Sequence, residues 1–245
     1  MDSGFYAACA GLRAQTQTLE MVANNLANLN TTGFRAHEAT FRSLLAGNAA
    51  VSHNALNRAV NDFGVLGGSR VDLHAGNLGE TGNPLDLAIE GEGFFAVQGR
   101  GQVLYTRNGN FRVSSSGQLI TSEGDPVLGE QGLISVPSGQ VAVGADGTLS
   151  VDGAIAGKLR VAAFAPGTSL RAVGSTYYAA PENAAPTAAT GSSIRQGMLE
   201  SSNVNAVAGT IALIAVQRQA EMLQRALSMF ATDFNHIAAS ELPRL

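Results

Sequence analysis

The feature that most constrains the fold of this chain is a seven-residue apolar repeat that occurs at both of its ends. Such a repeat places apolar side chains on one stripe of an α-helix and is typical of helices that pair as a coiled coil. Near the N-terminus it predicts a helix over residues 1–34. The predicted seam of this helix consists of Phe5, Leu12, Leu19, Val22, Leu26 and Leu29.

The C-terminal repeat is longer, and its apolar residues follow strict three- and four-residue spacing. It predicts a helix over residues 203–245, with Asn203 or Asn205 as its N-cap. A further apolar stripe at residues 204–214 precedes the main seam and is slightly offset from it. The predicted seam consists of Leu213, Val216, Leu223, Leu227, Phe230 and Phe234.

Between the two ends, the apolar period changes from that of a helix to that of a β-strand. Over residues 84–180, short apolar runs alternate with Asn-Gly, Ser-Gly and Asp-Gly turns, which predicts an inserted, mostly antiparallel β domain. We predict an extended linker over residues 35–83, with a short helix at 37–47, and a low-complexity linker over 181–202. The predicted fold class is therefore α+β, with terminal helices that pair as a coiled coil.

Asparagine is frequent in the stretch "ANNLANLNTTGFR", where a helix exposed to water would normally carry charged residues. An amide both donates and accepts hydrogen bonds, and it avoids the cost of burying a charge. We therefore expect Asn24, Asn25 and Asn28 to make polar contacts with neighbouring subunits. A fraying helix end, whose asparagines only prepare the turn, explains the same residues equally well.

The same stretch contains the predicted end of the helix. Asn and Gly adopt the left-handed conformation of a helix C-cap more readily than other residues. We expect Asn30 and Gly33 to end the helix and Phe34 to fix the direction in which the chain leaves it. Local turn packing is the alternative explanation for these residues.

The composition and the motifs point away from catalysis and from nucleic-acid binding. Charged residues make up 14% of the chain and the net charge is −4, so no basic surface for nucleic acid is expected. The four histidines lack metal-ligand spacing, and the single cysteine, Cys9, allows no intrachain disulfide. No nucleophile elbow or phosphate-binding loop is found. We predict no catalytic residue, cofactor or metal, and expect Phe94, Phe95, Tyr105 and Phe111 to form core.

Two further expectations concern membranes and export. No uninterrupted apolar stretch reaches 18 residues, so no membrane span is expected. The first residues lack the basic and apolar regions of a cleaved secretory signal. If the protein leaves the cytoplasm, we expect it to use another route.

Other functions stay open on the residues alone. Asp86, Glu90 and Glu92 could serve as the acid/base set of a polysaccharide-active enzyme, although they alternate along one predicted strand and a solvated strand face explains them more simply. A periplasmic or surface β-domain binding protein that oligomerises through its terminal helices would show the same heptads.

Four stretches resemble signature blocks of the bacterial flagellar rod and hook protein family, in the family's order: "ANNLANLNTTGFR", "DLAIEGEGFFAV", "YTRNGNFRVSSSGQLITSEGDPVLG" and "QGMLESSNVNAV". The resemblance implies a structural subunit of the basal-body rod, exported unfolded through the flagellar type III export apparatus and assembled in the periplasm. It also implies that the terminal helices surround a central export channel, in contact with other copies and with neighbouring rod proteins.

The length of 245 residues fits a rod protein better than the longer hook protein of this family. The stretches "LISVPSGQVAVGADGTLS" and "SSNVNAVAG" resemble proximal rod members. Ala208 and Gly209 stand where distal rod members usually have an acidic pair. The resemblance thus favours the proximal type and leaves the distal type as the alternative.

Overall fold

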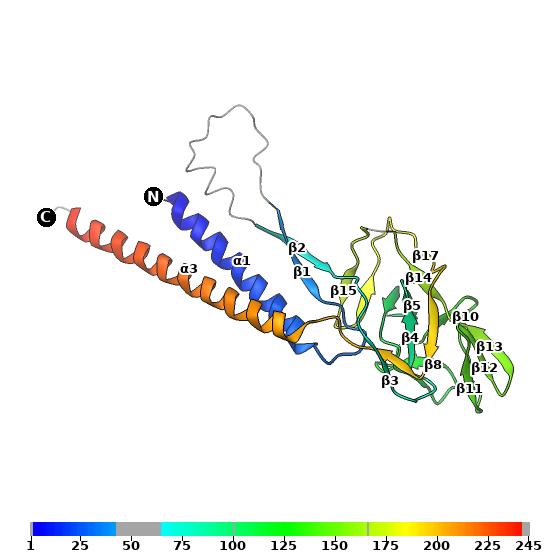
Figure 1. Ribbon diagram of the computed structural model, residues 1–245. Coiled ribbons are helices and arrows are strands. Elements are labelled where there is room, and N and C mark those ends of the chain that lie inside the picture. Colours follow the sequence, from blue (N-terminus) through cyan, green and yellow to red (C-terminus); the bar gives the residue numbers. More distant parts are fainter. Residues whose placement is uncertain (1, 43–64, 100, 166, 242–245) are drawn as a thin grey trace. The chain divides into compact units, whose positions relative to one another are not determined.

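The computed structural model describes residues 2–42, 65–99, 101–165 and 167–241 (Figure 1). In this described part, helix α1 (Asp2–Ala27) comes first in the sequence and helix α3 (Ala206–Glu241) comes last, and strands β1 to β19 lie between them in chain order. The registered strand pairs are antiparallel, so an α+β fold with mostly antiparallel sheets is confirmed. The chain divides into two compact units: unit 1 holds Met1–Leu26, His37–Ser69 and Asn205–Leu245, and unit 2 holds Ala27–Ala36 and Arg70–Val204.

Unit 1 contains both helices, which contact each other. A methyl group placed on Gly209 of α3 would lie 3.8 Å from Leu26 Cδ1 of α1, which is ordinary van der Waals contact. Ala14 and Val22 are the buried apolar residues of the described part of α1, whereas the predicted seam leucines of both helices are half-buried. The predicted seam residues Phe5, Phe230 and Phe234 lie outside the described side chains.

The predicted short helix at residues 37–47 is wrong where it can be compared, because β1 (His37–Arg42) is a strand. It pairs with β2 (Val65–Val71), which supplies the backbone hydrogen bonds that a helix would otherwise provide. Asn25 holds the first residue of this strand through both of its amide atoms. Its Nδ2 donates to His37 O at 2.8 Å, and its Oδ1 accepts from His37 N at 2.8 Å. Residues 43–64 lie outside the described residues.

Unit 2 is built around a six-stranded sheet in the order β15-β16-β6-β5-β14-β17. Its strands are β5 (Phe94–Gln98), β6 (Val103–Thr106), β14 (Val161–Ala163), β15 (Arg171–Val173), β16 (Tyr177–Ala179) and β17 (Thr187–Ala188). A three-stranded sheet comprises β11 (Val141–Val143), β12 (Thr148–Val151) and β13 (Ala154–Lys158). The remaining pairs are β3 (Leu78–Glu80) with β19 (Met198–Glu200), β4 (Leu87–Glu90) with β18 (Ser193–Gln196), β7 (Phe111–Val113) with β8 (Leu119–Thr121), and β9 (Leu128–Gly129) with β10 (Gly132–Leu133).

The core of unit 2 covers both faces of strand β5, because successive side chains of a strand point to opposite sides. Phe95 and Val97 belong to the larger apolar cluster, in which the Phe95 and Phe111 rings meet edge to face at 5.1 Å. Phe94 belongs to a second cluster together with Tyr105. The expectation that these four aromatic residues form core is confirmed.

The ends of unit 2 differ from the predicted boundaries. Residues 181–202 form no linker, because β17, β18 and β19 lie in this range and Ile194 is 5% exposed. The predicted helix over residues 1–34 ends at Ala27, and the C-terminal helix begins at Ala206. Its N-cap is Asn205, whose Oδ1 accepts a hydrogen bond from Ala208 N at 3.0 Å.

Candidate functional site

Three segments of unit 2 that are far apart in the sequence meet at one place, which we call the neck: residues 31–36, 72–77 and 198–204. The first segment follows helix α1, and the last precedes helix α3. Gly33 N donates to Glu200 O at 2.8 Å, so the two roots of the helices run side by side in unit 2. The neck therefore joins the two ends of the chain to the β-sheets.

Asn203 connects all three segments of the neck. Its Oδ1 accepts from Ala36 N at 2.7 Å. Its Nδ2 lies within hydrogen-bond distance of Asp72 O at 3.3 Å and His74 O at 3.0 Å. Although Asn203 was one of two predicted caps of the C-terminal helix, its side chain binds these backbone groups instead.

Gly33 is held in a conformation and a space that only glycine tolerates. Its φ of +70° lies in the left-handed region. A Cβ atom at this position would collide with the backbone nitrogen of Asn108. Next to it, Phe34 is fully buried. The prediction that Asn30 and Gly33 end the helix is wrong, because α1 ends at Ala27. The role of Phe34 in directing the chain stays a prediction.

A buried charge cluster lies inside the neck. Glu200, 1% exposed, stands between two guanidinium groups. Its Oε1 lies 2.6 Å from Arg35 Nη1, and its Oε2 lies 3.1 Å from Arg107 Nη1. Gly76 N donates to Oε1 at 2.7 Å, and Arg35 N donates to the Tyr178 hydroxyl at 3.1 Å. The cluster combines two positive charges and one negative charge with almost no access to solvent.

Burial shifts the pKa values of two members of this cluster, Arg107 and Tyr178. Desolvation lowers the pKa of Arg107 to about 10, and the nearby Arg35 charge acts in the same direction while Glu200 opposes it. Burial also raises the pKa of the Tyr178 hydroxyl to about 12. Arg107 is therefore cationic near neutral pH and Tyr178 is neutral, which suits these two groups to holding structure rather than to moving protons.

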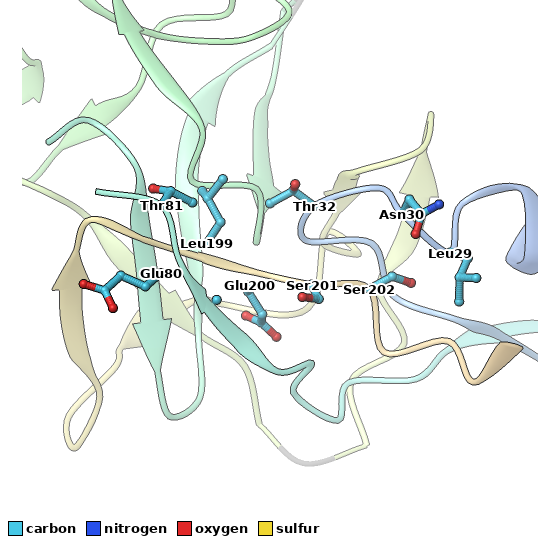
Figure 2. A pocket seen from close by; sticks show the side chains of 10 residues that line it. Leu29, Asn30, Thr32, Glu80, Thr81, Leu199, Glu200, Ser201 and Ser202 are labelled. Carbon is cyan, nitrogen blue, oxygen red and sulfur yellow. The ribbon is translucent and has the colours of Figure 1, made fainter. Parts of the chain in front are cut away.

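A polar pocket of about 270 Å³ lies beside the neck (Figure 2). Figure 2 shows the Leu199 and Glu200 side chains leaving strand β19 in opposite directions, as neighbouring residues of a strand do. Leu29 lines this pocket instead of the helix seam predicted for it, because helix α1 ends two residues earlier. The lining residues are Leu29, Asn30, Thr32, Gly79, Glu80, Thr81, Leu199, Glu200, Ser201 and Ser202.

The three carboxylates considered as an acid/base set lie in different environments, and Glu92 is exposed. Asp86 is 4% exposed and accepts hydrogen bonds from Thr81 Oγ1 at 2.7 Å and Asn110 Nδ2 at 3.0 Å. The prediction that Asp86 lies on a solvated strand face is therefore wrong, because these hydrogen bonds hold its carboxylate inside a loop. Glu90 is exposed and pairs with Arg195 at 2.7 Å, and hydrogen bonding by Arg195 lowers the pKa of this carboxyl.

The three asparagines predicted to contact other subunits have different environments. Asn25 binds the backbone of His37, as described above. Asn28 lies beyond helix α1, where its Oδ1 accepts from Thr31 Oγ1 at 3.1 Å. Asn24 is exposed on the helix. Contact of any of them with another subunit stays a prediction.

Helix α3 carries a second apolar stripe in addition to its half-buried seam. Its members are 47% to 70% exposed. At 100° per residue they lie on the side of the helix opposite to the seam residues Leu213, Val216 and Leu223. The slight offset expected for the stripe at residues 204–214 is therefore wrong, because three residues of that stretch belong to the exposed side. The residues of the second stripe are Val207, Ile211, Ile214, Met222 and Met229.

The sequence reasoning did not identify Arg35, Arg107, Tyr178 or Glu200. Their position in the sequence could have indicated a role, because Arg35, Arg107 and Glu200 each lie inside a stretch that carries the family resemblance. Their mutual contact spans separations that no local pattern reveals.

Within the described residues, no group of three or more His, Cys, Asp or Glu side chains could hold a metal ion. The described helices include none that is long and apolar enough to span a membrane.

Comparison with known proteins identifies the family of this chain. Residues 5–35 match the family model "Flagella basal body rod protein", 88–151 match "Flagellar hook protein FlgE/F/G D1 domain" and 195–232 match "Flagellar basal body rod FlgEFG protein C-terminal". "Flagellar basal-body rod protein FlgF" of Caulobacter vibrioides is 34% identical over 92% of each chain. The FlgF protein of Escherichia coli is 34% identical over 99% of this chain and 98% of its own. "Flagellar basal-body rod protein FlgG" of Agrobacterium fabrum is 33% identical over 90% of this chain and 92% of its own. The chain therefore belongs to the flagellar basal-body rod protein family.

Proposed function

We propose that this protein is a structural, non-catalytic subunit of the bacterial flagellar basal-body rod. Relatives named as rod proteins match it along nine-tenths or more of both chains. FlgF and FlgG relatives have similar identities, and the sequence features described first favour the proximal, F type over the distal, G type. Its location is then the rod of the basal body, within the periplasm.

The observation that carries the proposal is the pair of opposite apolar sides on helix α3. A helix that packs against one partner needs a single apolar stripe, whereas α3 has a half-buried seam and a second stripe that is mostly exposed. We infer that the seam pairs with α1 as a coiled coil and that the second stripe packs against other copies or neighbouring rod proteins. Repeated heterologous contacts of this kind produce an open helical assembly.

Such an assembly is a tube whose walls include the terminal helices and whose interior is the export channel. The β-sheets of unit 2 add lateral stiffness for the transmission of torque. Asn24 and Asn28 supply polar contacts between subunits in this arrangement. The family resemblance supports delivery of each subunit by the flagellar type III export apparatus.

The test is complementation of a strain that lacks this protein. Leu227→Asp changes the seam and Ile211→Asp changes the second stripe, and both variants should be exported but should abolish swimming because they place a charge in an apolar contact. Gln217→Asp is the matched control, since it places the same charge at an exposed polar position of the same helix. Normal swimming with Ile211→Asp would contradict the proposal, and a small closed oligomer of the purified protein would favour a binding protein instead.

A further inference from the structure

The neck contains a charge arrangement that assembly through the helices does not require. Arg35, Arg107 and Glu200 come from three distant parts of the chain, and each is 3% exposed or less. Glu200 is the carboxylate that both guanidinium groups contact. A buried cation that loses its counter-charge is strongly destabilising, so the position of Glu200 decides whether the two arginines can stay buried.

The two arginines depend on Glu200 to different degrees. Arg107 also donates to Ile89 O at 3.0 Å and to Gly91 O at 2.6 Å, and its guanidinium lies 5.4 Å from the centre of the Phe94 ring. Arg35 is fully buried, and its Nε, Nη1 and Nη2 make no hydrogen bond among the described residues, although Nη1 forms the ion pair with Glu200. The ion pair with Glu200 is therefore the main polar contact of the Arg35 side chain.

We propose that residues 198–203, which we call the closing strand, act as a strap that closes the neck. The closing strand enters between residues 33–36 and 72–77, where Glu200 neutralises the two arginines. The same strand contributes two backbone hydrogen bonds, Gly33 N to Glu200 O and Ser201 N to Asn77 O, and one through its side chain, Gly76 N to Glu200 Oε1, each within 2.8 Å.

Because of this arrangement, residues 33–36, which follow α1, and residues 198–203, which precede α3, become ordered in a single event. As long as the closing strand is undocked, Arg35 is in water and the segment that follows α1 has no partner strand for Gly33. When the closing strand docks, the neck segment that follows α1 and the neck segment that precedes α3 are fixed to each other. A chain whose last fifth is not yet in place therefore leaves residues 33–36 without their partners in unit 2. The inference uses the contacts of this chain only and does not depend on the flagellar role.

The test uses the full-length purified protein and the variant Glu200→Gln, which keeps the shape and removes the charge. We expect amide hydrogen exchange at Gly33, Gly76 and Ser201 to accelerate about 100-fold or more, because an unneutralised buried cation favours local opening. Exchange at Val97 in the core of unit 2 should stay unchanged. Trypsin should cut after Arg35 in this variant and leave that bond intact in the wild type.

The matched control is Glu90→Gln, which removes an exposed carboxylate that pairs with Arg195. It should leave the exchange of the neck amides unchanged. Unchanged neck exchange in Glu200→Gln would overturn the inference, and so would equal acceleration in the neck and at Val97, which would indicate plain global destabilisation.

A double variant, Arg35→Met with Glu200→Gln, separates charge from packing and replaces the single variant if that one does not fold. Removal of the Arg35 cation should return the exchange at Gly76 and Ser201 to within about tenfold of the wild type, because Arg107 keeps its hydrogen bonds to Ile89 O and Gly91 O and an apolar replacement of a buried ion pair is often tolerated. A neck that stays open in the double variant would show that neutralisation of Arg35 does not close it.

Discussion

The sheets of unit 2 and the helices of unit 1 differ in where their apolar side chains find partners. In strand β5, Phe95 and Val97 are completely buried within the single chain. In helix α3, Val207 and Ile211 remain 70% and 64% exposed. Unit 2 thus buries most of its large apolar residues by itself, although Leu133 and Ile155 remain 52% and 78% exposed. Helix α3 of unit 1 leaves a stripe of exposed apolar residues, with Arg218 and Arg225 among them, for something else to cover.

This difference separates the free energy of folding from the free energy of assembly. Full burial of an aliphatic side chain contributes about 1.5–3 kcal/mol. Burial of the exposed stripe of α3 in an assembly would therefore contribute several times this free energy, which the isolated chain does not gain. Changes in the neck and sheets should therefore lower stability, and changes on the stripe should lower assembly.

The largest expected effect is that of Gly33→Ala in the neck. The added Cβ would strain a left-handed residue, at about 1–2 kcal/mol, and would also collide with the backbone of Asn108. We expect a loss of more than about 3 kcal/mol in the free energy of unfolding. Urea unfolding followed by circular dichroism measures it.

Gly82→Ala is the matched control for this prediction. Gly82 has a φ of +71°, close to the +70° of Gly33, but a Cβ there would meet nothing within 4 Å. It should lose only the strain component of about 1–2 kcal/mol. Equal losses in the two variants would show that the close approach at Gly33 is not what matters.

The second prediction compares two asparagines on either side of the boundary between the units. Asn203→Ala removes a side chain that binds Ala36 N, Asp72 O and His74 O, and takes a partner from the half-buried Ala36 and Asp72 groups, at about 2–3 kcal/mol. Asn205→Ala removes a helix cap, at about 1 kcal/mol. Urea unfolding of both variants under identical conditions gives the comparison, and a larger loss at Asn205 would contradict it.

The sequence was most informative where the structure depends on local periodicity. The three- and four-residue spacing of Leu213, Val216 and Leu223 predicted a helix, and these residues are half-buried along α3. Alternation predicted strands, and Phe94 and Phe95 indeed belong to clusters on opposite sides of β5. Both patterns depend only on the geometry of one element.

Where contacts are distant in the sequence, local patterns failed. Asn108-Gly109 indicated a hairpin turn, but the flanking strands β6 and β7 pair with other strands, and a Cβ on Gly109 would collide with Leu87 O. The small-residue stretch that ends near residue 193 indicated a linker, yet β17 within it completes the large sheet. The pairing of Arg35 with Glu200 required the tertiary fold as well, because nothing in either neighbourhood specifies the partner.

The third prediction concerns the exposed stripe of α3. The pair of changes Ile211→Gln and Met222→Gln affects side chains that are 64% and 62% exposed, so the free energy of unfolding of the monomer should change by less than about 0.5 kcal/mol. Assembly should weaken strongly, because the apolar contact area of the stripe is reduced. Sedimentation velocity over a range of concentrations measures assembly. A stability loss comparable to that of Asn203→Ala would mean that the stripe is already satisfied within the chain.

The smallest expected effect is the pH dependence that His37 gives to unit 1. Burial lowers the pKa of His37, so the folded chain binds its proton less readily than the unfolded chain does. The neutral imidazole therefore contributes stability that is complete above the ordinary histidine pKa and is lost as the pH falls through the lower pKa of the folded state. Because this residue is only half-buried, the loss should be smaller than that of the helix cap at Asn205. Urea unfolding at about pH 7.5 and about pH 5.5 brackets the transition. The same measurement on His37→Gln cancels the contribution of the other histidines, and an equal loss in both proteins would assign the pH dependence to groups outside strand β1.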